Sequence, residues 1–166
     1  NICDMKLVKF GFISVSDRAS SMEYKDKALP ELKRIILSSV PQGYKVSIVA
    51  SDLIPDEIDT LKEKILLLSD SKKIDILITS GGTGISPRDI TPDVTRSLID
   101  KELPGFSEYM RNESIKYTKN AILSRQAVGI RGKTLIINLP GNPNSLFQLI
   151  PLICDQMYHC IDELNK

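Results

Sequence analysis

Three glycines and two carboxylates lie within one short stretch and together suggest a binding site for a phosphate-bearing ligand. Gly81, Gly82 and Gly84 carry no side chains, so the backbone N–H groups there can approach an anion closely. Asp89 and Asp93 follow, and divalent cations prefer carboxylate oxygens as ligands. The stretch therefore predicts an anion cradle with a metal beside it. Three glycines alone would equally suit a tight turn that binds nothing.

The glycine stretch does not match the two common nucleotide-binding fingerprints. It lacks the Gly-Lys-Ser/Thr ending of a P-loop, and Pro87 stands where the dinucleotide fingerprint has its third glycine. A ligand is therefore predicted from the surrounding elements and not from a known nucleotide signature.

The residues on either side of the glycines predict a buried strand and a helix. Residues 74–79 are β-branched and nearly all apolar, which is typical of a strand buried on both faces. Thr91 suits a helix cap, Pro92 the first helical position, and Asp93 the positive end of the helix dipole. A strand end followed by a helix start is a place where α/β proteins bind phosphates.

Strands and helices alternate along the rest of the chain. Strands are predicted at residues 9–16, 46–50, 128–130 and 133–139, the last two forming a hairpin around Arg131 and Gly132. Helices are predicted at 30–40, 56–68, from 91 to before 104, at 106–117 and at 146–164, while 121–127 suits either a loop or a short strand. This order predicts one domain over residues 1–166, an α/β fold with three α/β/α layers and a mostly parallel sheet.

The predicted strand exits share one kind of chemistry. In a parallel sheet, ligands bind beyond the carboxyl ends of the strands. These exits carry Asp17 and Ser20, Asp52 and Asp56, the glycine loop with Asp89, and the turn 140–145, where Asn142 or Asn144 would cap the next helix. The same chemistry at four exits strengthens the prediction of a site.

Composition excludes several classes of partner. Lys plus Arg is 22 and Asp plus Glu is 21, so no basic excess points to nucleic acid or to an anionic membrane. No apolar run approaches the roughly 20 residues that span a bilayer. No secretory signal is recognisable, and three cysteines, an odd number, fit a reducing compartment, which predicts a cytoplasmic protein. Asn1 is not a translation start, so residues 1–5 are expected to be a trimmed or added end or to lack order.

A metal site at the C-terminal Cys and His residues is disfavoured by their spacing. Cys154 and His159 are five residues apart, and Cys154 and Cys160 are six apart. On a helix neither pair shares a face. Thiols packed in a core helix are the expected arrangement.

Seven short motifs, in order and over nearly the whole chain, resemble the molybdopterin adenylyltransferase family, which comprises bacterial enzymes of molybdenum cofactor biosynthesis and the G domains of their plant and animal counterparts. They are Ser14-Val15-Ser16-Asp17-Arg18, Ile54-Pro55-Asp56-Glu57, Ser80-Gly81-Gly82-Thr83-Gly84, Pro87-Arg88-Asp89-Ile90-Thr91-Pro92-Asp93, Pro104-Gly105-Phe106, Leu123-Ser124-Arg125 and Asn138-Leu139-Pro140-Gly141-Asn142-Pro143. A paralogous group that shares the fold tends to lack the Pro-Arg-Asp and Thr-Pro-Asp pieces. The chain keeps both, which favours the active branch.

The resemblance implies a reaction and its cofactor. Members of the family transfer AMP from ATP to the terminal phosphate of molybdopterin, with Mg²⁺, and release pyrophosphate. The product passes to a protein that inserts molybdate. The resemblance also implies a homotrimer.

The resemblance also implies roles for particular residues. Asp56 and Asp89 match the catalytic and Mg²⁺-linked acids, although Asp56 would also suit a helix cap and Asp89 an ion pair with Arg88. Three further groups match binding residues: the nucleotide-phosphate cradle Gly81, Gly82, Thr83 and Gly84; the pterin-side residues Ser16, Asp17 and Arg18; and a second phosphate-contacting turn with Pro140, Gly141, Asn142, Pro143 and Ser145. Arg125 is a candidate phosphate contact.

A function of a different class stays open, namely a non-catalytic molybdopterin carrier or scaffold of the same fold. A carrier needs phosphate cradles but has no need of both Asp56 and Asp89. A generic nucleotide-binding enzyme is disfavoured only by the set of motifs.

Overall fold

The computed structural model describes residues 4–166, so the expectation for residues 1–3 lies outside it. Six strands form one sheet in the order β2-β1-β3-β6-β5-β4. Their bounds are β1 Lys6–Val15, β2 Tyr44–Ile54, β3 Ile76–Ser80, β4 Lys101–Glu102, β5 Val128–Arg131 and β6 Thr134–Leu139. The first four strands in the spatial order are parallel. At the far edge, β5 pairs antiparallel with both β6 and β4. The predicted mostly parallel sheet is confirmed.

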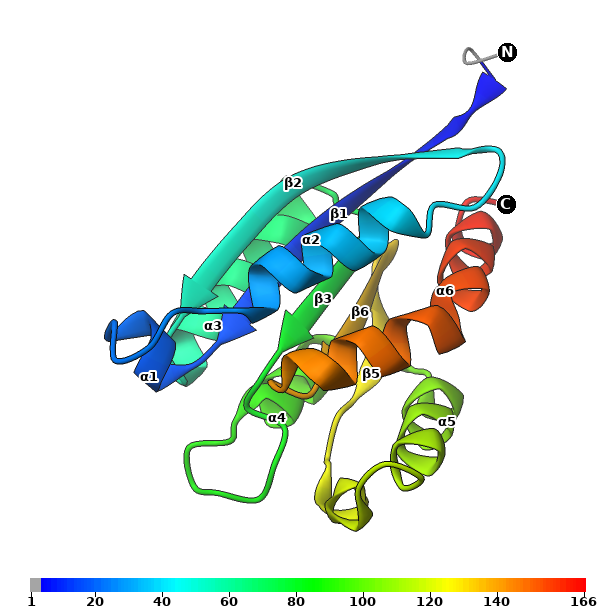
Figure 1. The fold of residues 1–166 in the computed structure, drawn as a ribbon. Helices are drawn as coiled ribbons and strands as arrows, with labels where there is room; N and C mark the ends of the chain where they lie inside the picture. Colours follow the sequence, from blue (N-terminus) through cyan, green and yellow to red (C-terminus); the bar gives the residue numbers. More distant parts are fainter. Residues whose placement is uncertain (1–3) are drawn as a thin grey trace.

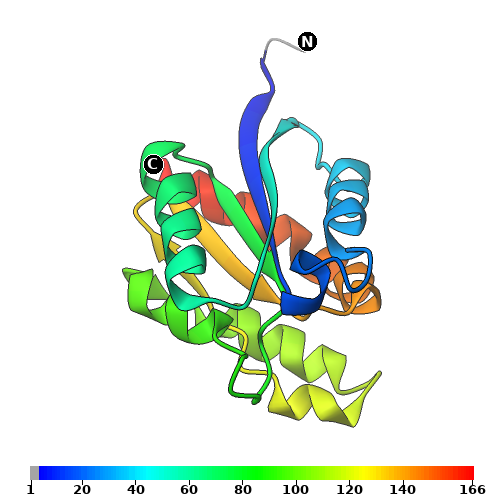
Figure 2. The same ribbon diagram turned by 90° about the vertical axis from the view of Figure 1, so that its left-hand side faces the viewer.

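Helices cover both faces of this sheet (Figure 1). Their bounds are α1 Asp17–Ser20, α2 Ala28–Ser38, α3 Ile58–Leu66, α4 Thr91–Leu98, α5 Pro104–Ser114 and α6 Pro143–Leu164, with a π-helical segment Leu67–Ser71 after α3 and a 3₁₀ segment Lys119–Leu123 after α5. Figure 2 shows the twisted sheet between α2 and α6 on one side and α3 on the other. This is the three-layer α/β/α fold that the sequence predicts.

The alternation of side chains along the central strands explains the two cores. Ile76 and Ile78 of β3 pack with α2, α5 and α6, whereas Leu77 packs with α3 and α4. In β6, Ile136 packs with the second group and its neighbours with the first. Because successive strand residues point to opposite faces, a strand buried on both sides must be apolar throughout. These strands end side by side at one edge of the sheet and position the glycine loop there.

Several predicted boundaries are wrong. β2 continues to Ile54, so Asp52 lies within the strand beside Ile13 and not in an exit loop; its carboxylate is 3.5 Å from Lys64 Nζ. α3 begins at Ile58 and not at residue 56. Pro104 starts α5 at its first position, where the missing N–H has no helical partner to lose.

The C-terminal half also differs in detail from the prediction. The hairpin turn lies one residue later than expected, because Arg131 pairs with Thr134 and Gly132 adopts a φ of +58°. Residues 121–127, for which the sequence suits either a loop or a short strand, form no strand before Val128 and begin with the last three residues of the 3₁₀ segment. The short edge strand β4 is absent from the sequence prediction. Asn142 caps α6 by accepting a hydrogen bond from the Asn144 N–H at 3.0 Å, one of the two expected caps. In the part of the chain that the structure describes, no helix is both long and apolar enough to cross a membrane.

Candidate functional site

Two strand-to-helix turns meet at the carboxyl edge of the sheet. The Gly81 N–H donates to the Leu139 carbonyl at 3.0 Å, and Ser80 Oγ donates to the Pro140 carbonyl at 3.1 Å. A side chain at Gly141 would lie 3.3 Å from Gly81 Cα, so the backbones of the two turns touch. The glycine loop and the turn after β6, predicted separately from the sequence, are therefore one structure.

The glycines of the loop are required by what surrounds them. Gly81 and Gly82 have φ angles of +103° and +66°, which side-chain-bearing residues rarely adopt. A Cβ at Gly81 would collide with the Val15 carbonyl oxygen, and one at Gly84 would lie 2.7 Å from Asp89 Oδ2. The loop is thus packed against the end of β1 on one side and against a carboxylate on the other.

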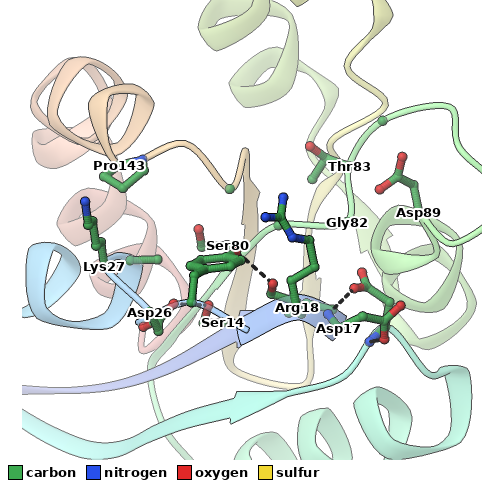
Figure 3. Close-up of a pocket in the computed structure, with 18 residues that line it drawn as sticks. Ser14, Asp17, Arg18, Asp26, Lys27, Ser80, Gly82, Thr83, Asp89 and Pro143 are labelled. Carbon is green, nitrogen blue, oxygen red and sulfur yellow. Dashed lines mark hydrogen bonds between the residues drawn. The ribbon is translucent and has the colours of Figure 1, made fainter. Parts of the chain in front are cut away.

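A cavity of about 720 Å³ opens over the glycine loop. Figure 3 shows Gly82, Thr83 and Asp89 on one side of it, with Arg18 reaching between the loop and the end of β1. The sequence-predicted residues that line it are Ser16, Asp17, Arg18, Asp56, Gly81, Gly82, Thr83, Gly84, Asp89, Gly141 and Pro143. The fold thus brings together both predicted acids, the predicted cradle and the predicted pterin-side residues.

The remaining predicted residues line a second, smaller cavity. Pro140, Asn142 and Ser145 border a space of about 350 Å³. Thr83 and Gly84 line both cavities, so the glycine loop separates them. The turn after β6 therefore borders both cavities, with Gly141 and Pro143 at the larger one and Pro140, Asn142 and Ser145 at the smaller one.

Asp56 is held next to Asp17 by two hydrogen bonds between neighbouring strand ends. Asp56 Oδ2 accepts from the Asp17 N–H at 2.8 Å, and Asp17 Oδ1 accepts from the Asp56 N–H at 2.9 Å. Asp56 does not cap α3, whose cap position is Glu57 without a side-chain bond. Burial, followed by the nearby charges of Asp17 and Asp89, raises the pKa of Asp56. The helix-cap alternative for Asp56 is therefore wrong.

Arg88 pairs with Asp17 and not with Asp89. Its Nε and Nη2 atoms donate to the two Asp17 oxygens, each at 2.8 Å. These hydrogen bonds lower the pKa of Asp17. Asp89 Oδ2 instead accepts from the Ser86 N–H at 2.9 Å. The alternative in which Asp89 pairs with Arg88 is thus also wrong, and the Asp89 carboxylate forms no ion pair within 4.0 Å in residues 4–166.

Arg125 clamps the loop that carries Asp89. Its Nε donates to the Gly84 carbonyl at 2.7 Å and its Nη2 to the Asp89 carbonyl at 2.7 Å, while Nη1 pairs with Asp93 at 2.9 Å. Its own N–H donates to the Thr83 carbonyl at 2.8 Å. Because all of its guanidinium nitrogens are engaged, Arg125 fixes the loop, and it is not a free phosphate contact.

Thr91 does not cap α4 as predicted. The cap position is Ile90, and Thr91 Oγ1 is buried without a hydrogen-bond partner in residues 4–166. A Cβ at Gly82 would collide with that oxygen and would lie 3.1 Å from Asp56 Oδ1. Thr91 therefore packs beneath the glycine loop close to Asp56.

The charges that line the larger cavity are unbalanced. Its walls carry four carboxylates, Asp17, Asp26, Asp56 and Asp89, and two cations, Arg18 and Lys27. Arg88 compensates Asp17, and the Asp26 oxygens accept from Ser14 Oγ and the Leu29 N–H. The carboxylates of Asp56 and Asp89 form no ion pair within 4.0 Å with any of residues 4–166, although the charge of Arg88 acts on Asp56 and that of Arg125 on Asp89. Within residues 4–166 no cluster of three or more His, Cys, Asp or Glu could hold a metal alone. The donor set is a pair of carboxylates, which suits Mg²⁺ bound together with substrate phosphates.

Five polar residues that line this cavity were not among the predicted site residues, in addition to the apolar Val15 and Ala28. The five polar residues are Ser14, Tyr24, Asp26, Lys27 and Ser80. Three of them belong to the segment between α1 and α2, where the signal was an aspartate two residues before a helix. The Leu29 N–H donates to Asp26 Oδ2 at 3.0 Å, so this aspartate fixes the start of α2 beside the cavity.

The C-terminal cysteines pack as thiols, each half-buried on α6. Cys154 Sγ donates to the Ser39 carbonyl at 3.2 Å, and burial raises the pKa of both Cys154 and Cys160. The His159 side chain is 75% exposed, 3.8 Å from Glu163.

Replacing Asp56 with asparagine is expected to stabilise the ligand-free protein. The folded-state pKa of Asp56 is raised, so its ionised form opposes folding at every pH above the unfolded-state pKa. Asparagine removes that charge and can still accept from the Asp17 N–H. The melting temperature should therefore rise at about pH 7.5, and the gain should disappear as the pH falls to about 4.

Thermal unfolding at the two pH values measures this gain. Asp155→Asn, on the exposed side of α6 and away from the cavity, is the control and should show no such pH-dependent gain. A lower melting temperature for Asp56→Asn at neutral pH would mean that the ionised Asp56 stabilises the fold, which would contradict the expectation that burial makes its charge unfavourable.

Comparison with known proteins gives concordant results. Residues 11–159 match the family described as "Probable molybdopterin binding domain". Two proteins named "Molybdopterin adenylyltransferase" are similar to the chain: that of Helicobacter pylori J99 is 40% identical over 95% of this chain and 88% of its own length, and that of Escherichia coli K12 is 39% identical over 91% and 76%. The crystal structure of the molybdopterin biosynthesis enzyme MoaB from Thermus thermophilus superposes with a TM-score of 0.84, at 35% identity over 95% of this chain and 96% of that one.

Proposed function

Because the chain belongs to the molybdopterin adenylyltransferase family, an enzyme family of molybdenum cofactor biosynthesis, we propose that its larger cavity transfers AMP from ATP to the terminal phosphate of molybdopterin. The single observation that carries this proposal is that the glycine loop and both predicted acids, Asp56 and Asp89, line the same cavity. The loop after β3 supplies side-chain-free backbone and Asp89, and the loop between β2 and α3 supplies Asp56. A nucleotidyl transfer needs a phosphate cradle and charge neutralisation at one point.

Asp56 and Asp89 are the residues that would hold Mg²⁺. Both line the cavity and neither forms an ion pair within 4.0 Å in residues 4–166, and burial disfavours the bare charge of Asp56, an arrangement that a bound cation relieves. When bound, Mg²⁺ neutralises phosphate charge that develops in the transition state. Polyanionic substrates would otherwise meet an excess of carboxylates in this cavity.

The proposed reaction is a displacement at the α-phosphorus of ATP. An oxygen of the molybdopterin phosphate forms a new P–O bond, and the bond to the β-phosphate breaks, so that pyrophosphate leaves with the electron pair. The chain's part is positioning: the loop 81–84 would fix the nucleotide phosphates, and Arg125 holds that loop through the Gly84 and Asp89 carbonyls. Arg88 holds Asp17, which in turn fixes the Asp56 backbone.

The two cavities offer separate places for the planar groups of the substrates. Ser16, Asp17 and Arg18 remain the proposed pterin-side residues, and they share the larger cavity with the glycine loop. The proposed second phosphate-contacting turn has three residues that face the smaller cavity, namely Pro140, Asn142 and Ser145. Both substrates would then meet across the glycine loop, where the reacting phosphates must lie together.

The experiment that tests this function is an assay of the purified protein with ATP, molybdopterin and Mg²⁺, followed for adenylylated molybdopterin and pyrophosphate. A carrier of the same fold is the alternative function, and it would bind molybdopterin without forming either product. The presence in one cavity of both Asp56 and Asp89, neither in an ion pair within residues 4–166, favours the enzyme.

Assembly, partner and location are further parts of the proposal. A homotrimer is supported by exposed apolar side chains on and after α5, namely Tyr109, Ile115, Tyr117, Ile122 and Leu123. Light scattering at micromolar concentration should give the mass of three chains; a stable monomer would contradict it.

The product is handed to a molybdate-inserting protein. The odd number of cysteines supports a cytoplasmic location.

A further inference from the structure

We propose that Lys27 is a further substrate-binding residue and that its ammonium group binds a substrate phosphate in the larger cavity. The inference rests on the proposed function, which supplies two phosphate-bearing substrates. It concerns the segment between α1 and α2, which none of the seven motifs includes.

Lys27 lines the cavity with its charge unpaired. Its side chain makes no hydrogen bond and no ion pair with any of residues 4–166. In Figure 3 it lies toward Pro143, at the side of the cavity away from Asp17 and Asp89. An ammonium group at this place can contact an anion without first breaking a bond within the protein.

The neighbouring arginines are engaged elsewhere. Arg88 binds both oxygens of Asp17, and Arg125 binds Asp93 and two loop carbonyls. Arg18, the other cation in the cavity wall, lies 3.5 Å from Glu23 and over the Tyr24 ring at 5.1 Å. Lys27 is therefore the one cation of this wall, among the described residues, that has no partner.

Asp26 fixes the backbone that presents Lys27. Its Oδ1 accepts from Ser14 Oγ of β1 at 2.8 Å, and its Oδ2 accepts from the Leu29 N–H of α2 at 3.0 Å. Both carboxylate oxygens are thus bonded, and no ion pair within 4.0 Å joins Asp26 to Lys27. The lysine is anchored at the cavity while its charge stays available to a ligand.

The position of Lys27 complements the two acids. A metal held by Asp56 and Asp89 would neutralise phosphate charge at one side of the cavity, and Lys27 would neutralise it at the other. Two sources of phosphate fit this chemistry: the β- and γ-phosphates of ATP, and the terminal phosphate of molybdopterin.

Titration calorimetry and steady-state kinetics on Lys27→Met test the proposal. The probes are Mg²⁺–ATP, Mg²⁺–pyrophosphate and AMP for binding, and molybdopterin as a substrate. We expect Kd, or KM for molybdopterin, to rise about tenfold for at least one phosphate-bearing probe, the usual effect of losing a charge-assisted hydrogen bond. If the source is ATP, Kd should rise for ATP and pyrophosphate while AMP stays within about twofold. If the source is molybdopterin, its KM should rise while nucleotide binding is unchanged.

Two further variants keep the test decisive. Lys25→Met removes an exposed lysine that does not line the cavity and should change none of these quantities. Lys27→Arg keeps the charge and should restore most of the affinity, which a purely structural role would not predict. Unchanged values for every probe, or equal losses in Lys25→Met, would overturn the proposal. If the parental protein bound no Mg²⁺–ATP, the proposed function itself would fail, a result distinct from a silent Lys27 variant.

Discussion

Asp56→Asn and Asp89→Asn are each expected to lower the rate of adenylyl transfer at least about a hundredfold, roughly 2.7 kcal/mol of activation free energy. Asparagine keeps the shape of the side chain and removes the charge that would hold the cation. The loss should fall on kcat, because phosphate charge is neutralised most strongly as the bond to pyrophosphate breaks. Molybdopterin affinity should change much less.

Single-turnover measurement with saturating molybdopterin separates this loss from a binding defect. Asp52→Asn is the matched control, because Asp52 lies on β2 only four residues before Asp56 but does not line the cavity. The structure makes the asparagine test cleaner, since Asp56 is not a helix cap whose loss could mimic a catalytic one. A double variant that transfers AMP at the parental rate would refute a role for this pair.

Gly84→Ala is expected to lower the rate by about a hundredfold with little loss of stability, since small misplacements of catalytic groups have effects of this size. The new methyl group would lie 2.7 Å from Asp89 Oδ2, so the carboxylate must move. The φ of Gly84 is not positive, so alanine fits its backbone. Rate and melting temperature are the two measurements.

Gly105→Ala is the control for this substitution, because no atom lies within 4 Å of the added carbon at that position. It should leave the rate unchanged. Gly82→Val is a poorer test of the cradle, because Gly82 has a φ of +66° and a side chain there would collide with Thr91, so folding and binding would both suffer. A Gly84→Ala enzyme of parental activity would mean that Asp89 does not need its observed position.

The elements that could be predicted from the sequence are those whose pattern is strong. The nearly all apolar, β-branched run before the glycines is typical of a strand covered on both faces, and it lies at the centre of the sheet as β3. β2 was cut short in the prediction because its half-buried second part carries polar residues such as Ser51 and Asp52, which resemble a loop. In the folded protein these residues belong to the strand, because β2 pairs with β1 as far as Ile54.

Side-chain partners across the site could not be predicted. Arg88 is adjacent to Asp89 in the sequence, yet the turn directs it to Asp17, 71 residues away. Arg125 resembles a phosphate contact in the sequence, and only the fold shows that loop carbonyls and Asp93 engage it. Lys27 has no sequence signal of its own, since it enters the cavity through the path of the chain after α1. Local patterns predict elements, whereas contacts between distant segments depend on the assembled sheet edge.

The most direct test of the proposed activity follows a label from ATP into molybdopterin. The purified protein is incubated with molybdopterin and ATP labelled either at the α- or at the γ-phosphate, with Mg²⁺ or with a chelator. We expect α-label in the molybdopterin product, γ-label only in pyrophosphate, and neither product when the metal is removed. Bound molybdopterin that acquires no α-label in the presence of Mg²⁺ would contradict the enzyme and identify the protein as a carrier.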